Sequence, residues 1–463
     1  YHDAHVLPPS PLGDLVRLFQ LRAGVPRDRV EHIFVAEDVE LLKALGLLTD
    51  EGDEVHGCVD LFCSGGLLFA TDHRYMIRES DCLDEDPVMY IGMDSHGLVQ
   101  TAPRQHCTQV LDLCCGSGVQ GLVASRYARQ VVAVDLNPRA VRFARFNAQL
   151  NGVTNFEVRL GNLYEMVAGE RFDCILANPP FVPSPDESLK FRDGGTSGED
   201  ILRDIIEGSD QHLELGGRLC IVTDLVDADH YTEKLRSWMD SATCYGLILT
   251  TADRNEILFS VPHCHAPFGQ SFKDYNCELD RWIANFRGSN LHAVNFGYIL
   301  VWRRSEGAGW DITRRTIHNP SSPIWEQVQD WIEQRWLWDS EEAGSMVLGL
   351  HPDLKIVTKE RPDGEERSCE LHLEENPFFT TYAVSTAIAD ALRHIYVTEP
   401  TLMDRLSSLD ADWVEELHRK GVLRLRTARR PVKARQEAKK ENANGIEEHA
   451  TKTTPTCLSS YLG

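Results

Sequence analysis

The sequence predicts an α/β fold built on a parallel, doubly wound sheet, with small modules before and after it. From about residue 105, short apolar strands alternate with helices, as in the strand at 109–113, the helix at 119–127 and the strand at 131–134. Such alternation is typical of a parallel sheet covered by helices on both faces. The 463 residues exceed what one hydrophobic core usually supports, so we expect two or three domains.

The other elements of the sheet follow in the same order. A helix at 138–150 carries apolar residues at Val141, Ala144 and Ala148, and Asn151-Gly152 closes it. The remaining expected elements are strands at 156–160, 172–177, 218–223, 245–251 and 297–303, and helices at 201–215 and near 279–286, the last two strands forming a pair.

Both flanks are expected to be winged-helix-like α+β modules. At the N-terminal end, the apolar helix-like segment 39–48 runs into a hairpin turn at 50–53. At the C-terminal end, a run of three helices is followed by the strand-like text KGVLRLR. The last stretch is polar with few apolar anchors, which predicts disorder. The expected domains are an N-terminal accessory domain at 1–84, the α/β domain at 85–305, a C-terminal accessory domain at 306–427 and a disordered tail at 428–463.

Composition and charge narrow the classes of partner. The formal net charge of −24 disfavours, without excluding, a phosphate backbone as partner, because cationic side chains supply much of the affinity for nucleic acids. No apolar run approaches the ~20 residues needed to span a bilayer, so no membrane partner is expected. The 13 cysteines are scattered, which favours reduced thiols and a cytoplasmic location.

The strongest local signal is the segment VLDLCCGSGVQG, residues 110–121. An apolar strand runs into Gly116-Ser117-Gly118, and Gly121 lies at the start of a helix. Gly116 and Gly118 allow a tight turn and a close approach of the backbone to a ligand, while Gly121 allows close packing of helix on strand. Such a Rossmann-like loop serves both nicotinamide nucleotides and S-adenosylmethionine (SAM).

A second signal is Asp135, at the end of the strand VVAVD. A carboxylate at the tip of the second strand can accept hydrogen bonds from both ribose hydroxyls of either cofactor. The same residue, before Asn137-Pro138, also suits a helix cap.

The third signal distinguishes the two cofactors: Asn178-Pro179-Pro180-Phe181 follows the fourth strand. The two prolines remove backbone donors and fix φ, so the carbonyls point outward. The Asn178 Oδ1 and the Pro179 carbonyl can then accept both protons of one NH2 group, with Phe181 stacked on its flat face. This arrangement would hold a planar nitrogen in line with a methylsulfonium.

The set DLCCGSG, VDLNPRA, GNLYE and NPPF, in this order and spacing, resembles a class I SAM-dependent methyltransferase of the "methyltransferase small" type. The motifs are similar to those of release-factor glutamine methyltransferases, and Phe191-Arg192-Asp193-Gly194-Gly195 resembles the DGG loop of that family. The chain also resembles larger predicted methyltransferases with accessory domains at both ends. The fold that this implies is a class I methyltransferase sheet in the 85–305 domain.

The resemblance implies roles for individual residues. Gly116 and Gly118 would approach the methionine part of SAM, Asp135 would bind the ribose, and Leu136 would lie against the adenine. Asn162 replaces the family's usual Asp at the adenine amino group. The cofactor-binding set is completed by Asp112, Cys114, Leu163 and Asn178, and the acceptor-binding set is Asn178, Pro179, Pro180 and Phe181.

The predicted function is therefore SAM-dependent methylation of a planar nitrogen, in a protein side-chain amide or a small molecule. Phe181 instead matches the RNA guanine-N2 enzymes, so an RNA or DNA base (guanine-N2 or adenine-N6) stays the alternative acceptor. An NAD-type oxidoreductase would leave NPPF without a role, and a non-catalytic SAM-binding scaffold would not need outward carbonyls. No metal is expected, since His263-Cys264-His265 with Cys277 matches no common zinc spacing.

Overall fold

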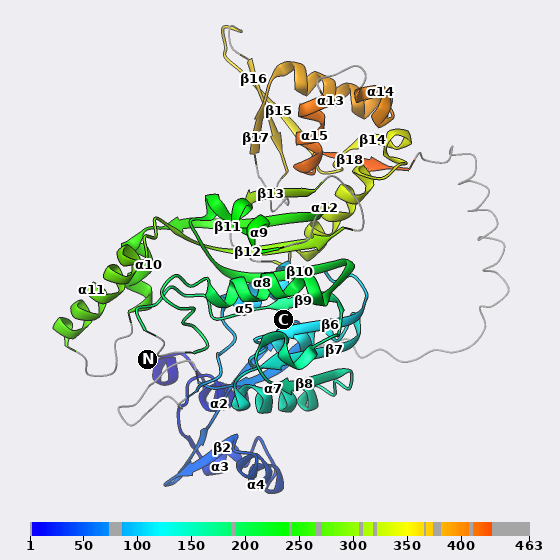
Figure 1. Ribbon diagram of the computed structural model, residues 1–463. Coiled ribbons are helices and arrows are strands. Elements are labelled where there is room, and N and C mark those ends of the chain that lie inside the picture. Colours follow the sequence, from blue (N-terminus) through cyan, green and yellow to red (C-terminus); the bar gives the residue numbers. More distant parts are fainter. Residues whose placement is uncertain are drawn as a thin grey trace, which may run out of the picture. The chain divides into compact units, whose positions relative to one another are not determined.

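The computed structural model describes residues 2–73, 86–186, 190–239, 243–264, 271–304, 309–317, 322–364, 367–373, 381–406 and 411–427 (Figure 1). The chain divides into two compact units, one of Tyr1–Glu333 with His372–Tyr382 and one of Gln334–Leu371 with Ala383–Gly463. The predicted disordered tail, 428–463, lies outside the described residues. In the described part of the chain, no helix has the length and apolar character to cross a membrane.

The first unit is built around an eight-stranded sheet with the order β13-β11-β12-β10-β9-β6-β7-β8. Strands β8, β7, β6, β9 and β10 are mutually parallel, whereas β12 is antiparallel to both β10 and β11. The strands are β6 (Cys107–Leu113), β7 (Ala128–Asp135), β8 (Phe156–Leu160), β9 (Phe172–Ala177), β10 (Leu213–Val226), β11 (Cys244–Arg254), β12 (Val294–Arg303) and β13 (Trp310–Thr316).

The expectation of a parallel sheet is corrected at β12, and the sheet is mixed. Helices α10 (Glu256–His263) and α11 (Phe272–Gly288) lie in the chain between β11 and β12. The two strands they join are hydrogen-bonded antiparallel neighbours, so β12 begins at the same end of the strands at which β11 stops. The predicted pairing of 245–251 with 297–303 is confirmed, with Tyr245 opposite Trp302.

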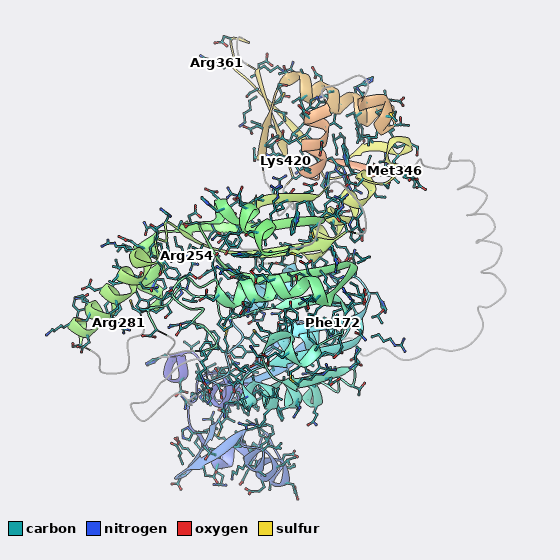
Figure 2. All side chains as sticks on the ribbon, in the orientation of Figure 1. Phe172, Arg254, Arg281, Met346, Arg361 and Lys420 are labelled. Carbon is teal, nitrogen blue, oxygen red and sulfur yellow. The ribbon has the colours of Figure 1, made fainter. Side chains whose placement is uncertain are left out.

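Helices cover both faces of the sheet because successive strand residues point to opposite sides. In β9, Cys174 and Leu176 belong to one apolar cluster, and Ile175 and Ala177 belong to the other. Phe172, at the start of β9, is fully buried (Figure 2). The first cluster also takes residues from α5 (Met93–Thr101), α6 (Val119–Ala124) and α12 (Trp325–Trp338), and the second takes residues from α8 (Asp200–His212) and α9 (Tyr231–Trp238).

The hairpin of β4 (Asp60–Ser64) and β5 (Leu67–Thr71) is attached to helix α7 (Pro138–Leu150) by two asparagines. Asn147 accepts from the Ala70 N–H at 2.8 Å and donates to the Ala70 carbonyl at 3.0 Å. Asn151 makes the same pair of bonds to Leu68, at 2.9 and 2.7 Å. Four residues along a helix and two residues along a strand both span about 6–7 Å. The two asparagine amides therefore have the spacing of the backbone groups of β5, and they bind its edge as a neighbouring strand would.

Small sheets accompany the central sheet at both ends of the chain. The N-terminal sheet has the order β1-β3-β2, and the C-terminal segments form the pair β14-β18 and the three strands β15-β16-β17. The N-terminal elements are α1 (His2–His5), α2 (Pro11–Phe19), β1 (Val25–Pro26), α3 (Arg27–Val30), α4 (Ala36–Ala44), β2 (Leu48–Glu51) and β3 (Glu54–Gly57). The C-terminal elements are β14 (Val347–Leu350), β15 (Lys355–Glu360), β16 (Arg367–His372), β17 (Thr381–Val384), α13 (Thr386–Thr398), α14 (Leu402–Leu406), α15 (Ala411–Arg419) and β18 (Leu423–Arg426).

Candidate active site

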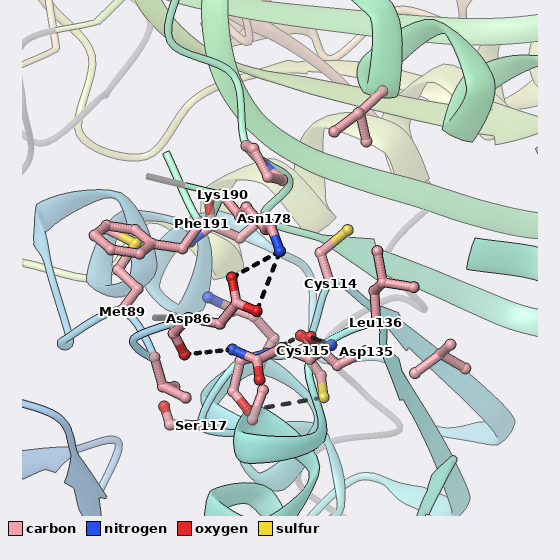
Figure 3. A pocket seen from close by; sticks show the side chains of 18 of the residues that line it. Asp86, Met89, Cys114, Cys115, Ser117, Asp135, Leu136, Asn178, Lys190 and Phe191 are labelled. Atoms are coloured by element: carbon pink, nitrogen blue, oxygen red, sulfur yellow. Dashed lines mark hydrogen bonds and ion pairs between the residues drawn. The ribbon is translucent and has the colours of Figure 1, made fainter. Parts of the chain in front are cut away.

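A cavity of about 250 Å³ opens where β6, β7, β8 and β9 end (Figure 3). This is the edge of an open parallel sheet at which ligands bind. Its volume is close to the lower end of the ~300–1,000 Å³ typical of small-molecule sites. Of the predicted site residues, it is lined by Cys114, Gly116, Asp135, Leu136, Asn162, Leu163, Asn178 and Pro180, and not by Asp112, Gly118, Pro179 or Phe181.

The loop between β6 and α6 takes an unusual backbone path. Cys114, Gly116 and Gly118 all have positive φ, at 55°, 53° and 83°. A side chain on Gly116 would meet nothing within 4 Å, so its backbone faces open space. At Gly121, a Cβ would lie 2.8 Å from the Phe156 ring, so this glycine is required by close packing, as the sequence predicted.

Asp112 lies behind this loop rather than in the cavity. Its side chain is fully buried, and Oδ2 accepts a hydrogen bond from the Gly121 N–H at 2.8 Å. Burial raises the pKa of Asp112 to about 7, and the Gly121 N–H acts in the opposite direction. The residue therefore fixes the first turn of α6, and the structure does not bring it to the cavity surface.

Asp135 lies in the cavity wall with both carboxylate oxygens engaged. Oδ2 accepts from the Gly116 N–H and Oδ1 from the Asn137 N–H, each at 2.8 Å. Burial raises the pKa of Asp135, and these two N–H groups lower it. A carboxylate has about four acceptor positions, so two remain for ligand hydroxyls. The helix cap that the sequence also suggested for Asp135 is supplied by Asn137, whose side chain accepts from the Arg139 N–H.

The cavity next to Asp135 is also lined by an exposed leucine and a strained turn. Leu136 is 67% exposed beside the cavity, so its side chain offers an apolar surface to a bound ring. Asn162 precedes a 3₁₀ turn that begins at Leu163, whose φ is 43°. The structure thus brings Leu136, Asn162 and Leu163 to one cavity with the glycine loop.

The NPPF segment is held by the loop that carries the DGG stretch. The Arg192 carbonyl accepts from the N–H groups of Phe181 and Val182, at 3.1 and 2.9 Å. A Cβ on Gly194 would lie 2.9 Å from both the Phe181 Cα and the Pro180 carbonyl oxygen, so only glycine allows this approach. The two motifs that the sequence placed close in the chain therefore form one packed unit.

Phe181 itself lies away from the cavity. Its ring is 6.5 Å from the ring of Phe296 and packs against the apolar cluster that includes Phe259 and Trp282 of the α10–α11 insertion. Arg281 lies on α11 of that insertion (Figure 2). Its guanidinium pairs with Asp186 at 2.7 Å. Stacking of Phe181 on an acceptor stays a prediction.

Two cavity features were missed from the sequence. Lys190 and Asp86 form an ion pair at 2.9 Å, and both line the cavity. Ser95 also lines it, and with the neighbouring Asp94 it contacts the Asn178 amide. The sequence signal for Asp94 and Ser95 was slight, because they form an isolated Asp-Ser pair at the start of a helix that was not predicted.

The histidine–cysteine cluster considered for a metal falls partly outside the described residues, because His265 is not among them. His263 stacks against Trp282 with ring centroids 5.5 Å apart, and the Cys264 thiol donates to the Ser260 carbonyl. Within the described ranges, no group of three or more His, Cys, Asp or Glu residues is arranged to hold a metal ion.

Comparison with known proteins agrees with this geometry. Residues 91–243 match the family "Methyltransferase small domain", and residues 5–57 match a domain of unknown function, DUF7059. The release factor glutamine methyltransferase of Geobacter sulfurreducens is 33% identical over 153 residues, which are 29% of this chain and 53% of that protein. Its counterpart in Xylella fastidiosa is 36% identical, over 24% of this chain and 46% of that protein.

A third relative is the ribosomal protein uL3 glutamine methyltransferase of Bradyrhizobium diazoefficiens, which is 30% identical over 40% of this chain and 63% of its own length. The chain therefore spans about half the length of the relatives it matches. Residues 91–243 are a methyltransferase small domain, a class I SAM-dependent methyltransferase domain related to the release-factor glutamine methyltransferases.

Proposed function

We propose that this chain transfers the methyl group of SAM to the nitrogen of a side-chain amide in a protein. One observation carries the proposal: a single cavity is lined by the glycine loop and Asp135 on one side and by Asn178 and Pro180 on the other. A cofactor site and a site for an NH2 group are therefore contiguous, as direct methyl transfer requires.

The residues present fit SAM. Asp135 keeps two acceptor positions for the ribose hydroxyls, and Gly116 leaves open space where a ligand can approach the backbone. Leu136 offers an apolar surface for the adenine, and Asn162 can accept from its amino group. When bound, SAM supplies an electrophilic methyl group on a sulfonium.

Asn178 is suited to binding an NH2 group. Its Nδ2 already donates to Asp94 and to Ser95, at 3.0 and 3.2 Å, so Oδ1 is the atom left for an acceptor molecule. The Pro179 carbonyl is the second acceptor in this proposal. Two such bonds draw electron density toward a weakly nucleophilic amide nitrogen and hold it in place.

The net charge of the chain and its similarity to protein methyltransferases favour a protein substrate. The net charge of −24 works against binding a nucleic-acid backbone. The relatives carry names that specify glutamine methylation in release factors and in ribosomal protein uL3. The accessory segments at both ends, which we propose to be winged-helix-like, are available to bind such a partner. The cysteines that the structure describes form no disulfide, which fits a cytoplasmic site of action.

The test uses methyl-labelled SAM with the purified chain and an extract of source cells that lack it. We expect label that protease digestion removes and ribonuclease does not. Asp135→Ala should weaken SAM binding, measured calorimetrically, whereas Asn178→Ala should abolish transfer and leave binding largely intact. Label lost only with ribonuclease would identify a nucleic-acid base as the acceptor, and label in a small soluble product would identify a metabolite. Equal SAM affinity in wild type and Asp135→Ala would refute the cofactor assignment.

A further inference from the structure

The first turn of α5 brings a buried carboxylate to the acceptor-binding asparagine. Asp94 Oδ2 accepts from Asn178 Nδ2 at 3.0 Å, and Ser95 Oγ accepts from the same nitrogen at 3.2 Å. Asp94 is 7% exposed and Ser95 is 4% exposed. The Ser95 carbonyl in turn accepts from the Gln120 side chain at 2.9 Å, which ties this turn to the helix after the glycine loop.

Asp94 occupies an environment that is unfavourable for a carboxylate. Burial raises its pKa, and the bond from Asn178 lowers it. Among the described residues, no salt bridge includes Asp94; its charge is balanced mainly by hydrogen bonds from Asn178 and from the backbone N–H groups of Ser95 and of Asp94 itself, and least by the nearby His96. Burying a carboxylate without a salt bridge costs free energy, and such groups concentrate at functional sites.

The chemistry of the pair selects one orientation of the Asn178 amide. An amide has two donors on nitrogen and an acceptor on oxygen, and the two ends have nearly the same shape. An ionised carboxylate can only accept, so Asp94 binds the nitrogen end and repels the oxygen end. Ser95 makes no such choice, because a hydroxyl can donate or accept. Asp94 is therefore the group that turns Asn178 Oδ1 toward the cavity.

A reversed amide would present N–H groups to the acceptor. An incoming NH2 group would then face donors where it needs an acceptor, and the hydrogen bonds that hold the nitrogen would be lost. The bond to an ionised group also polarises the Asn178 amide and strengthens its oxygen as an acceptor.

We propose that Asp94 is a positioning residue that fixes the Asn178 amide with Oδ1 toward the methyl acceptor, and thereby restricts the site to nitrogens that carry hydrogen. The inference rests on the proposed function, since it assigns how Asn178 distinguishes its substrate. Asp94 acts through Asn178, because it does not itself line the cavity.

The first test is Asp94→Asn, which keeps the shape and removes the charge. At saturating labelled SAM and with the cell extract as acceptor, we expect the rate of label transfer to fall about 10- to 100-fold, as loss of a charge-assisted bond implies. The dissociation constant for SAM should stay within about 2-fold of wild type, because Asp94 does not line the cavity in which SAM is proposed to bind and only its neighbour Ser95 does. Ser95→Ala is the matched control, with an expected loss below about 5-fold.

A reciprocal exchange separates positioning from a general structural role. Asn178→Asp alone sets two carboxylates against each other and should transfer label poorly. Asp94→Asn combined with Asn178→Asp restores one donor and one acceptor with reversed polarity and leaves a carboxylate oxygen toward the cavity. We expect the double variant to be at least about 10-fold faster than Asn178→Asp alone, a rescue that reports coupling between the two side chains.

The outcomes distinguish the inference from the function on which it rests. Wild-type transfer with an unchanged rate in Asp94→Asn would overturn the inference and leave the function standing. A parallel fall in SAM affinity and melting temperature in Asp94→Asn, with no rescue in the double variant, would make Asp94 a structural residue and also overturn it. Absence of both SAM binding and transfer in the wild type would overturn the function, and the inference with it.

Discussion

Asn147 offers a quantitative test of how the N-terminal hairpin is attached. The side chain is fully buried and bonds to the N–H and carbonyl of Ala70 and, at 2.9 Å, to the carbonyl of Ser117 in the glycine loop. Asn147→Ala removes all three hydrogen bonds at once and leaves the three backbone groups without that partner. Asn151→Ala is the matched control, because Asn151 also makes three bonds: a pair to Leu68, which is 49% exposed, and one to the carbonyl of Asn147 at 2.7 Å.

The two variants should differ in the free energy of opening of β5. A buried polar group left without a partner costs about 1–3 kcal/mol, so three such groups give about 3 kcal/mol even at the lower bound. At Leu68, water can replace the lost amide, so Asn151→Ala should cost about 1 kcal/mol or less. A difference of 1.4 kcal/mol is tenfold in an equilibrium constant, so the larger value corresponds to about 100-fold.

Hydrogen–deuterium exchange of the peptide spanning β5, read by mass spectrometry, measures this opening directly. We expect exchange to accelerate about 100-fold in Asn147→Ala and less than about 10-fold in Asn151→Ala. Because Asn147 also holds the Ser117 carbonyl, only the first variant should weaken SAM binding. Equal acceleration in the two variants would refute the argument that burial, and not the number of bonds, sets the magnitude.

Two further predictions concern the loop that carries the DGG stretch and the second unit. Gly194→Ala puts a Cβ against the backbone of Phe181 and Pro180, so label transfer should fall at least about 10-fold with SAM affinity unchanged, while Gly288→Ala, which meets nothing within 4 Å, should have no effect. Burial lowers the pKa of His418 to about 3, so the folded state binds fewer protons than the unfolded state. Stability of the second unit should therefore fall by about 1.4 kcal/mol per pH unit below pH ~6.5, until about pH 3. Exchange protection of α15, corrected for intrinsic rates, should show this loss, and an unchanged pH slope in His418→Gln would contradict it.

Local chemistry made much of the α/β domain predictable. The predicted helix 138–150 has the bounds of α7, because the proline at its start and the Asn151-Gly152 sequence at its end are local signals. The glycine loop, Asp135 and Asn178 meet at one cavity because each follows a strand that ends at the same sheet edge.

What the sequence could not supply depends on contacts between distant segments. The bond from Asn178 to Asp94 joins residues 84 positions apart, and no local pattern marks it. The direction of β12 depends on how the α10–α11 insertion returns to the sheet. Phe181 follows the motif in sequence, yet the apolar cluster of that insertion takes up its ring. For the accessory segments, the arrangement of the small sheets and helices could not be predicted, because short elements carry weak periodicity.

The attachment of β5 to α7 also has a consequence for the order of synthesis. Ala70 leaves the ribosome 77 residues before Asn147, its hydrogen-bonding partner. At about 5–20 residues per second, the hairpin waits roughly 4–15 s for that partner. An isolated two-stranded hairpin is only marginally stable in water. During this interval its edge is open to other chains, so the nascent N-terminal segment is where we expect chaperone contact to be concentrated.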